Sequence, residues 1–111
     1  MNPIQLRESD ATDMKNTITE CLTGSERKGT ELSYWPSGTD EVIDGDRMVQ
    51  LKLTIAWKRK EIFIHARVRE KPQVKKTCLI TVGFLDGISE ADEGFQIHIR
   101  EHEPIIVKVI G

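Results

Sequence analysis

The segment from Val49 to Arg69 constrains the fold more than any other part of the chain. Apolar residues occupy odd positions in its first run and even positions in its second, and the charged tetrad 58–61 (KRKE) separates the runs. Successive side chains of a β-strand point to opposite faces, so each run has one apolar face. The change of parity requires a turn or a bulge between Trp57 and Ile62. We therefore predict a long β-hairpin over roughly 48–70. Its inward residues are Val49, Leu51, Leu53, Ile55, Trp57, Ile62, Ile64, Ala66 and Val68.

A helix is predicted ahead of the hairpin, over about residues 10–22. Apolar residues recur there at spacings of three and four, which places them along one side of a helix. Ser9 or Asp10 can cap its first turn, and Gly24 follows its last turn. The side expected to pack on the sheet is formed by Ala11, Met14, Ile18, Cys21 and Leu22.

Five other segments predict shorter elements. Residues 31–35 suit a short strand, residues 95–100 alternate in polarity, and residues 105–110 are almost wholly apolar. Residues 77–85 have apolar side chains on both parities, which predicts a central strand covered on both faces. Ser89-Glu90-Ala91-Asp92 resembles a capping box and predicts a single helical turn. The two parities of the central strand hold Cys78, Ile80, Val82 and Phe84 on one side and Leu79 and Leu85 on the other.

These patterns predict an α+β fold: a mostly antiparallel sheet of about five to six strands with one N-terminal helix on a face. The 111 residues suit a single domain with one core. The helix occupies about residues 10–22 of this domain, and the β-rich part occupies about 31–111. A small β-barrel of the OB or SH3 type is the alternative, because the patterns do not decide whether the sheet closes.

The strand at 105–110 runs almost to the last residue. A long apolar strand left at the edge of a sheet invites pairing with another chain. The strand is therefore expected either to pair inside the sheet or to lie against a second copy of the protein. A homodimer formed through residues 105–110 is thus one of the two predictions.

Composition indicates a soluble globular protein, with 38% hydrophobic and 31% charged residues. No apolar run approaches the roughly 18 residues that span a bilayer, so no membrane partner is expected. The N-terminus lacks an apolar segment after a basic start, which predicts no secretory signal. Two cysteines, Cys21 and Cys78, are too few for a disulfide framework. Reduced thiols in a cytoplasmic protein are the expectation.

The net charge of −2 conceals a strong segregation of charge along the chain. Residues 1–47 carry a net charge of −5, residues 48–76 carry +7, and residues 77–111 carry −4. The acidic flanks suit neutralisation of the basic stretch within one fold. The same pattern also suits a basic patch that meets an anionic partner.

The outward face of the hairpin is the main candidate binding surface. If the apolar faces point inward, this face combines several cations with one aromatic ring. Cations contact phosphates and an exposed ring stacks on a base, so the basic hairpin 52–76 is a candidate nucleic-acid interface. The alternative is a solvated strand face with Phe63 covered by the helix or a loop. The candidate residues are Lys52, Lys58, Arg59, Lys60, Phe63, His65, Arg67 and Arg69.

A second candidate patch comes from a similarity within the chain. Residues 64–67 (IHAR) resemble residues 97–100 (IHIR), and both histidines lie on the polar parity of their strands. If the two strands were neighbours, their polar side chains would form a cationic site for a phosphate or a carboxylate. That site would consist of His65, Arg67, His98 and Arg100.

No catalytic or metal site is predicted. His98 and His102 share a parity, but a metal needs a third ligand, which Glu101 on the opposite parity cannot supply. Cys21 and Cys78 lie on apolar faces and suit packing better than nucleophilic chemistry. The sequence has no nucleophile elbow and no glycine-rich phosphate loop. No cofactor is expected, and an enzyme is the least favoured class.

Two functions follow from these observations. The first is a small, intracellular, non-enzymatic module that binds another protein, such as an inhibitor, immunity factor or adaptor. The second is a nucleic-acid-binding β-domain that uses the basic hairpin. An uncovered basic face would favour the second function, and a face packed under the helix would favour the first.

Overall fold

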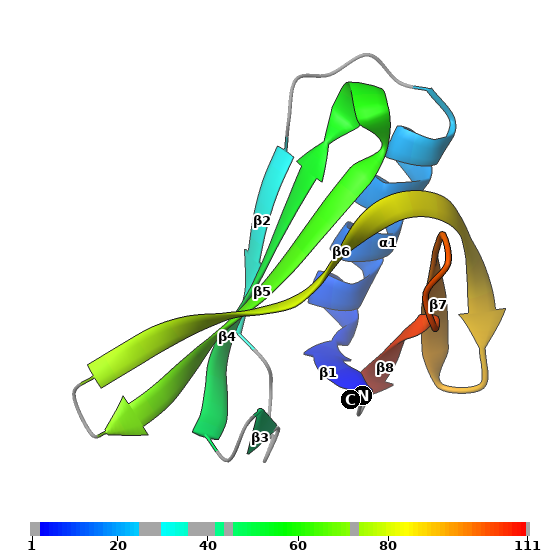
Figure 1. The fold of residues 1–111 in the computed structure, drawn as a ribbon. Coiled ribbons are helices and arrows are strands. Elements are labelled where there is room, and N and C mark those ends of the chain that lie inside the picture. The colour runs from blue at the N-terminus through cyan, green and yellow to red at the C-terminus, as the bar shows by residue number, and fades with distance from the viewer. Residues whose placement is uncertain (1–2, 25–29, 36–41, 44–45, 72–73, 111) are drawn as a thin grey trace.

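The structure, a computed structural model, describes residues 3–24, 30–35, 42–43, 46–71 and 74–110. For residues 42–43, 46–47, 69–71 and 74–79 it describes the backbone alone. The elements are shown in Figure 1 and are β1 (Ile4–Arg7), α1 (Glu8–Leu22), β2 (Thr30–Tyr34), β3 (Val42–Ile43), β4 (Asp46–Ala56), the 3-10 turn η1 (Trp57–Arg59), β5 (Glu61–Lys71), β6 (Val74–Ala91), β7 (Gly94–Ile99) and β8 (Ile105–Ile110).

The predicted α+β class is confirmed. Seven strands of the described chain follow one another in the order β1-β8-β7-β6-β5-β4-β2, and the short β3 pairs with β4 as well. β1 and β8 are parallel, whereas every other pairing is antiparallel. The strand number is close to the five or six expected. β1 and β2 end the order, so the sheet is open rather than the closed barrel that was the alternative.

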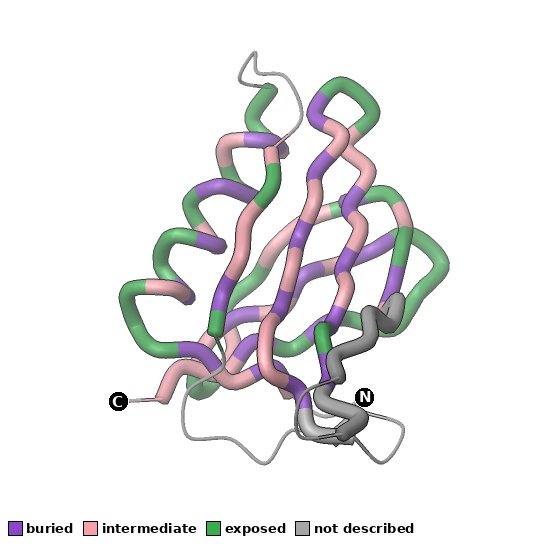
Figure 2. The backbone as a smooth tube through the Cα atoms, turned by 90° about the vertical axis from the view of Figure 1, so that its left-hand side faces the viewer, coloured by how far each residue is buried: buried purple, intermediate pink, exposed green. Residues whose placement is uncertain are grey.

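β4 and β5 form the predicted hairpin. Its turn is η1 followed by Lys60, which has a left-handed φ of 53°. Val49 is only half-buried, because the register shifts between Met48 and Gln50 and turns Met48 inward instead. The other predicted inward residues are all buried, and Figure 2 shows buried residues alternating with half-buried ones along the strands.

β6 changes its partner along its length. Its residues 74–84 pair with β5, and its residues 85–91 pair with β7. Figure 1 shows this strand curving from one group of strands to the other. We call β2 to β5 with residues 74–84 the first half of the sheet. Residues 85–91 with β7, β8 and β1 are the second half.

Two backbone hydrogen bonds hold the corner where the halves meet. The Leu85 amide donates to the Lys60 carbonyl at 2.7 Å, and the Arg100 amide donates to the Phe84 carbonyl at 2.9 Å. The peptide unit between Phe84 and Leu85 is therefore tied to the hairpin turn of the first half and to the end of β7.

α1 lies on the concave side of the curved sheet, against β6, β8 and β1. The helix begins at Glu8, and Arg7 occupies the N-cap position rather than Ser9 or Asp10. β1 runs directly into the helix, which moves its start ahead of the predicted one. Its buried residues are Ala11, Met14, Thr17, Ile18 and Cys21, close to the predicted stripe.

β8 is an interior strand of the sheet. Val107, for example, pairs with Phe95 of β7 on one side and with Ile4 of β1 on the other. The apolar C-terminal strand is thus paired inside the sheet, the first of the two predicted outcomes. The edge that would have paired with a second copy is occupied by β1.

The helical turn predicted at residues 89–92 is wrong. β6 continues as a strand through Ala91, and the chain turns at Asp92 and Glu93 into β7. Ser89 pairs with Gln96 across this hairpin. Pairing with β7 therefore overrides the local capping pattern.

Candidate functional site

The outer face of the first half is the side turned away from the core. Lys52 and Thr54 of β4 and Phe63, His65 and Arg67 of β5 are half-buried or exposed there, while their neighbours along each strand are buried. α1 packs on the concave side, and no element that the structure describes packs on this outer face. The helix therefore does not cover Phe63, and the predicted outward face is open.

Three apolar side chains adjoin on this face, and we call Phe63, Val82 and Phe84 the apolar strip. Phe63 pairs directly with Val82, and Phe84 lies two residues further along β6, opposite Glu61. Directly opposed and diagonal side chains on one face of a sheet lie within contact distance. Val82 is 43% exposed and Phe84 is 40% exposed. These adjoining, partly exposed apolar side chains are a candidate interaction surface.

The prediction that β6 is covered on both faces is wrong. Val82 and Phe84 were expected to face the core, yet Thr81 and Leu85 are the buried residues of this stretch. The position of β6 in the middle of the sheet was predicted correctly. The apolar strip was not predicted, because the alternation along β6 assigned Val82 and Phe84 to the core.

A β-bulge at Ile80 explains this error. Ile64 pairs with Thr81, but the next residue of β5 pairs with Leu79, so Ile80 is an extra residue on β6. A shift of one residue turns every later side chain to the opposite face. The sequence signal that indicates such an irregularity is Gly83, because glycine inside a strand accompanies bulges and close approaches.

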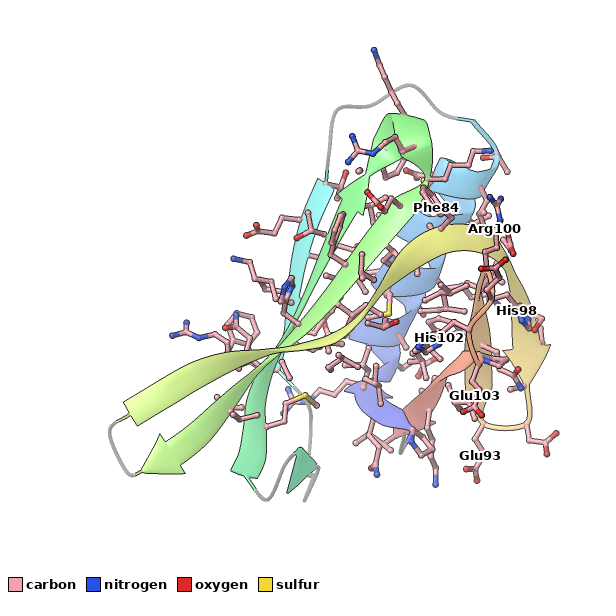
Figure 3. The ribbon with its side chains drawn as sticks, in the orientation of Figure 1. Phe84, Glu93, His98, Arg100, His102 and Glu103 are labelled. Atoms are coloured by element: carbon pink, nitrogen blue, oxygen red, sulfur yellow. The ribbon has the colours of Figure 1, made fainter. Side chains whose placement is uncertain are left out.

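Arg100 covers one end of the apolar strip. Its guanidinium carbon lies 5.5 Å from the centre of the Phe84 ring, which is cation–π geometry. The same guanidinium forms an ion pair with Asp86, with 3.2 Å between Nη2 and Oδ1. Figure 3 shows Phe84 and Arg100 together at the corner between the two halves.

Two further ion pairs border the strip. Lys52 Nζ lies 3.1 Å from Glu31 Oε1 on β2, and Arg59 Nη2 lies 3.1 Å from Glu61 Oε1 at the hairpin turn. Pairing of this kind reduces the net field of a basic surface, because each cation has a carboxylate beside it. The border of the strip is therefore polar without being strongly cationic.

A hollow of about 330 Å³ adjoins the strip on the same face, and we call it the cationic hollow. Lys52 lies directly opposite His65 in the sheet, and Thr54 lies directly opposite Phe63. The strip and the hollow are therefore contiguous. The hollow is lined by Glu31, Lys52, Thr54, His65 and Arg67.

The remaining predicted cations of the hairpin do not join this group. Lys60 reaches back to the end of α1, where Nζ donates to the Leu22 carbonyl at 3.4 Å. Lys58 and Arg59 are exposed at the turn. Arg69 is paired in the sheet through its backbone, and its side chain lies outside the described part. The predicted patch is thus divided between the hairpin turn and the sheet face.

His65 and His98 lie far apart in the sheet. β6 separates their strands, and the residues opposite them on β6 are Leu79 and Gly87. These positions are eight residues apart, about 26 Å along a strand at 3.3 Å per residue. His98 Nε2 instead lies 2.6 Å from the Ser89 hydroxyl. The predicted combined site of two histidines and two arginines does not form.

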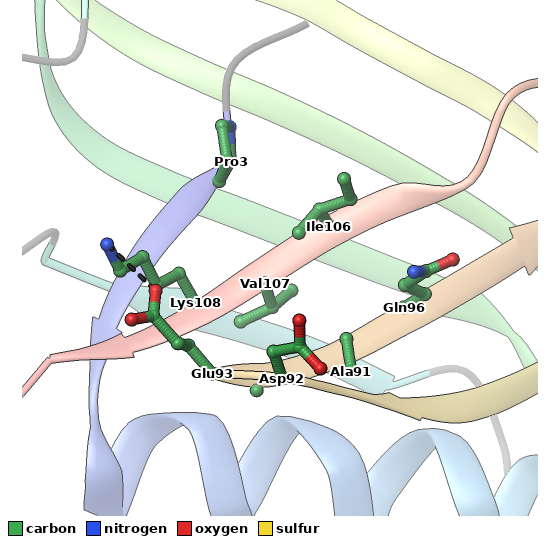
Figure 4. A pocket seen from close by; sticks show the side chains of 9 residues that line it. Pro3, Ala91, Asp92, Glu93, Gln96, Ile106, Val107 and Lys108 are labelled. Carbon is green, nitrogen blue, oxygen red and sulfur yellow. Dashed lines mark ion pairs between the residues drawn. The ribbon is translucent and has the colours of Figure 1, made fainter.

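The second half has a hollow of its own, of about 420 Å³ (Figure 4). Lys108 Nζ and Glu93 Oε2 form an ion pair at its border, 3.0 Å apart. Ile106 is 40% exposed beside them. The lining residues are Pro3, Ala91, Asp92, Glu93, Gly94, Gln96, Ile106, Val107 and Lys108. This hollow has two carboxylates and one cation.

The helix thiol suits packing rather than chemistry. Cys21 is buried and its Sγ lies 3.9 Å from the Trp57 carbonyl. Burial raises the pKa of the Cys21 thiol, and the nearby charge of Lys60 opposes this effect. A raised pKa disfavours the reactive thiolate. The side chain of Cys78, the other predicted thiol, lies outside the described part.

Among the described residues, no group of three or more histidine, cysteine, aspartate or glutamate side chains is placed to hold a metal ion. Within the same residues, no helix has the length and apolar character needed to cross a bilayer.

The structure thus brings six predicted or newly found residues together on one open face: Lys52, Phe63, His65, Arg67, Val82 and Phe84. No family model, curated protein or solved structure matches the chain. The function is therefore argued from this face.

Proposed function

We propose that the protein is a small non-enzymatic module that binds another protein on the outer face of the first half of its sheet. The apolar strip carries this proposal, because Val82 and Phe84 are 43% and 40% exposed on a face that no described element covers. Burial of such side chains against a partner removes apolar surface from water and stabilises the complex.

The arrangement around the strip supports a protein partner. Protein interfaces have an apolar centre with aromatic residues and a polar rim, and arginine is enriched in them. Phe63 and Phe84 supply aromatic rings, and the ion pairs of Lys52, Arg59 and Arg100 form the rim. An inhibitor, an immunity factor or an adaptor is the class of protein that this surface suits.

A nucleic-acid partner is the second candidate, favoured by the openness of the basic face. His65 and Arg67 beside Phe63 provide cations next to a ring on which a base can stack. The ion pairs of Lys52, Arg59 and Arg100 argue against this candidate, because each of these cations already has a carboxylate beside it and gains less from a phosphate. We therefore place protein binding first.

The proposal is tested by affinity capture from a lysate of the source cells. The double variant Val82→Ser/Phe84→Ser removes the strip, and Ile106→Ser is the matched control, since Ile106 is as exposed as Phe84 but lies in the second half. We expect one protein, identified by mass spectrometry, to be retained by the parent and the control and lost by the double variant. Circular dichroism establishes that all three are folded.

Fluorescence anisotropy with short DNA and RNA, at low and moderate salt, separates the two candidates. The protein-binding proposal predicts no tight binding to either. Tight binding that falls steeply with salt and is lost in Lys52→Gln/Arg67→Gln would contradict it and establish the second candidate. Retention of the captured protein by the double variant would also contradict it.

A further inference from the structure

The cationic hollow continues the line of the apolar strip along β5. Phe63, His65 and Arg67 lie on one parity of this strand and face the same side. Side chains on one face of a strand repeat about every 6.6 Å. An extended segment lying along β5 therefore meets a ring first, then the hollow, at two successive repeats.

The lining of the hollow carries more positive than negative charge. Lys52 and Arg67 are cationic, and the carboxylate of Glu31 is the acidic group of the lining. Glu31 pairs with Lys52 at 3.1 Å. In the part of the chain that the structure describes, no ion pair joins Arg67 to another residue. The hollow therefore has one formal positive charge beyond its own ion pair, with the imidazole of His65 next to it.

We propose that the cationic hollow receives a carboxylate side chain of the docked protein. The inference rests on the proposed function. It identifies the recognised segment as an extended one, with an apolar side chain over the strip and an aspartate or glutamate about two or four residues further on. Arg67 supplies a planar donor fork that suits a carboxylate, and His65 and Lys52 supply further donors.

The excess of one charge favours a carboxylate over a phosphate. A carboxylate carries one negative charge, which the hollow balances while the Glu31–Lys52 pair stays in place. A phosphate monoester carries about −1.5 to −2, which the hollow does not balance. Charge complementarity thus favours an acidic protein segment over a phosphorylated one, and the oligothymidylate below tests the singly charged phosphodiester.

The test is amide chemical-shift mapping of the ¹⁵N-labelled full chain with three probes. The first is the peptide acetyl-Phe-Thr-Glu-Thr-Glu-amide, the second is the same peptide with glutamine in place of both glutamates, and the third is a short oligothymidylate. We expect shifts on the first half of the sheet, with the glutamate peptide binding about tenfold more tightly than the glutamine peptide.

Three variants locate the effect. Lys52→Gln and Lys108→Gln are matched, since both lysines have 41% side-chain exposure and both pair with a glutamate, at 3.1 and 3.0 Å. Lys52→Gln or Arg67→Gln is expected to remove most of the preference for glutamate, whereas Lys108→Gln leaves it unchanged. Dispersed amide spectra show that each variant is folded.

The outcomes separate the inference from the proposed function. Equal affinity for the two peptides, with shifts on the first half, overturns the carboxylate inference and leaves the docking face in place. Shifts from neither peptide overturn the carboxylate inference, and the capture experiment with Val82→Ser/Phe84→Ser then decides the docking face. Tighter binding of the oligothymidylate than of either peptide overturns both the inference and the proposed function, and identifies the hollow as a phosphate site.

Discussion

The two halves of the sheet share several surface features. Each has a half-exposed lysine that pairs with a glutamate at about the same distance, an apolar side chain that is 40% exposed, and a hollow. The hollow of the second half is the larger one, at about 420 Å³ against 330 Å³. None of these features, taken singly, distinguishes a binding face from an ordinary surface.

The difference lies in what stands next to each lysine. Lys52 has Arg67 and His65 beside it, and the apolar strip continues from them. Lys108 has two carboxylates, Asp92 and Glu93, in its hollow, and a single exposed isoleucine. Contiguity of cations with apolar side chains, rather than exposure or hollow size, therefore distinguishes the candidate site.

The largest loss of stability that we expect comes from substituting two glycines that lie very close to neighbouring residues. A Cβ at Gly94 would lie 2.0 Å from the Val107 carbonyl oxygen, and one at Gly83 would lie 2.4 Å from Ile99 Cγ2. A side-chain methyl can shift more easily than a paired backbone. Gly94→Ala should therefore lower the free energy of unfolding by about 3 kcal/mol, and Gly83→Ala by about 1 to 2 kcal/mol.

Urea denaturation of both alanine variants measures this difference. Equal losses, or a larger loss for Gly83→Ala, would contradict the expectation that a methyl group against paired backbone costs more than one against a side chain.

The sequence predicted most of the secondary structure and four of the six residues of the open face, but not Val82 and Phe84. Alternation over 49–69 and the helical spacing of 11–22 are local patterns, and both matched the structure except at Val49, where the register shifts. The exposure of Val82 and Phe84 depends on the bulge at Ile80, which arises from pairing with β5. The alternation along a single strand does not show the register in which that strand pairs with a distant segment.

The second predicted patch, which combined His65 and Arg67 with His98 and Arg100, does not form because of the strand order. The similar tetrapeptides 64–67 and 97–100 are present in the chain, but β6 lies between their strands. The predicted helical turn at 89–92 failed because the residues pair with β7. In each case a contact between distant residues decided the structure.

The two halves also differ in how α1 holds them. The Tyr34 hydroxyl of β2 donates to Asp13 Oδ2 at 2.6 Å, and Tyr34 is buried. Lys15 forms an exposed ion pair with Glu90 on the second half. Tyr34→Phe should lower the free energy of unfolding by about 1 kcal/mol. Lys15→Ala should change it by about 0.5 kcal/mol or less, because exposed pairs contribute little.

The same tyrosine predicts a pH dependence. Burial, the hydrogen bond to Asp13 and the charges of Asp13 and Asp10 all raise the pKa of Tyr34. The unfolded chain releases this proton near its ordinary pKa of about 10, whereas the folded chain keeps it. The stability that Tyr34 contributes is therefore fully present below a pH of about 10 and is lost as the pH rises further.

The chain has one tyrosine, so the ultraviolet absorbance of tyrosinate reports on Tyr34 alone. We expect the absorbance to rise together with the loss of circular dichroism at alkaline pH. A rise at about pH 10 while the protein stays folded would contradict the buried hydrogen bond.

The smallest difference in stability that we expect concerns the two hairpin turns. Lys60 in the first half and Glu101 in the second both have left-handed φ values, 53° and 57°. Glycine relieves this strain at either position. Glu101→Gly should therefore be neutral or stabilising by up to about 1 kcal/mol. Lys60→Gly loses the bond to the Leu22 carbonyl, so it should be less stable than Glu101→Gly by about 0.5 to 1 kcal/mol. Thermal unfolding of the two variants gives the order, and the reverse order would mean that Lys60 contributes nothing to holding α1.

We propose that the outer face of the first half, and not that of the second, binds the partner. Isothermal titration of the captured protein with the parent, Phe84→Ser and Ile106→Ser tests this proposal, because the two side chains are equally exposed. We expect about 30-fold weaker binding for Phe84→Ser, the effect of losing an interface hot spot, and less than about twofold for Ile106→Ser. Equal losses, or a loss confined to Ile106→Ser, would contradict it.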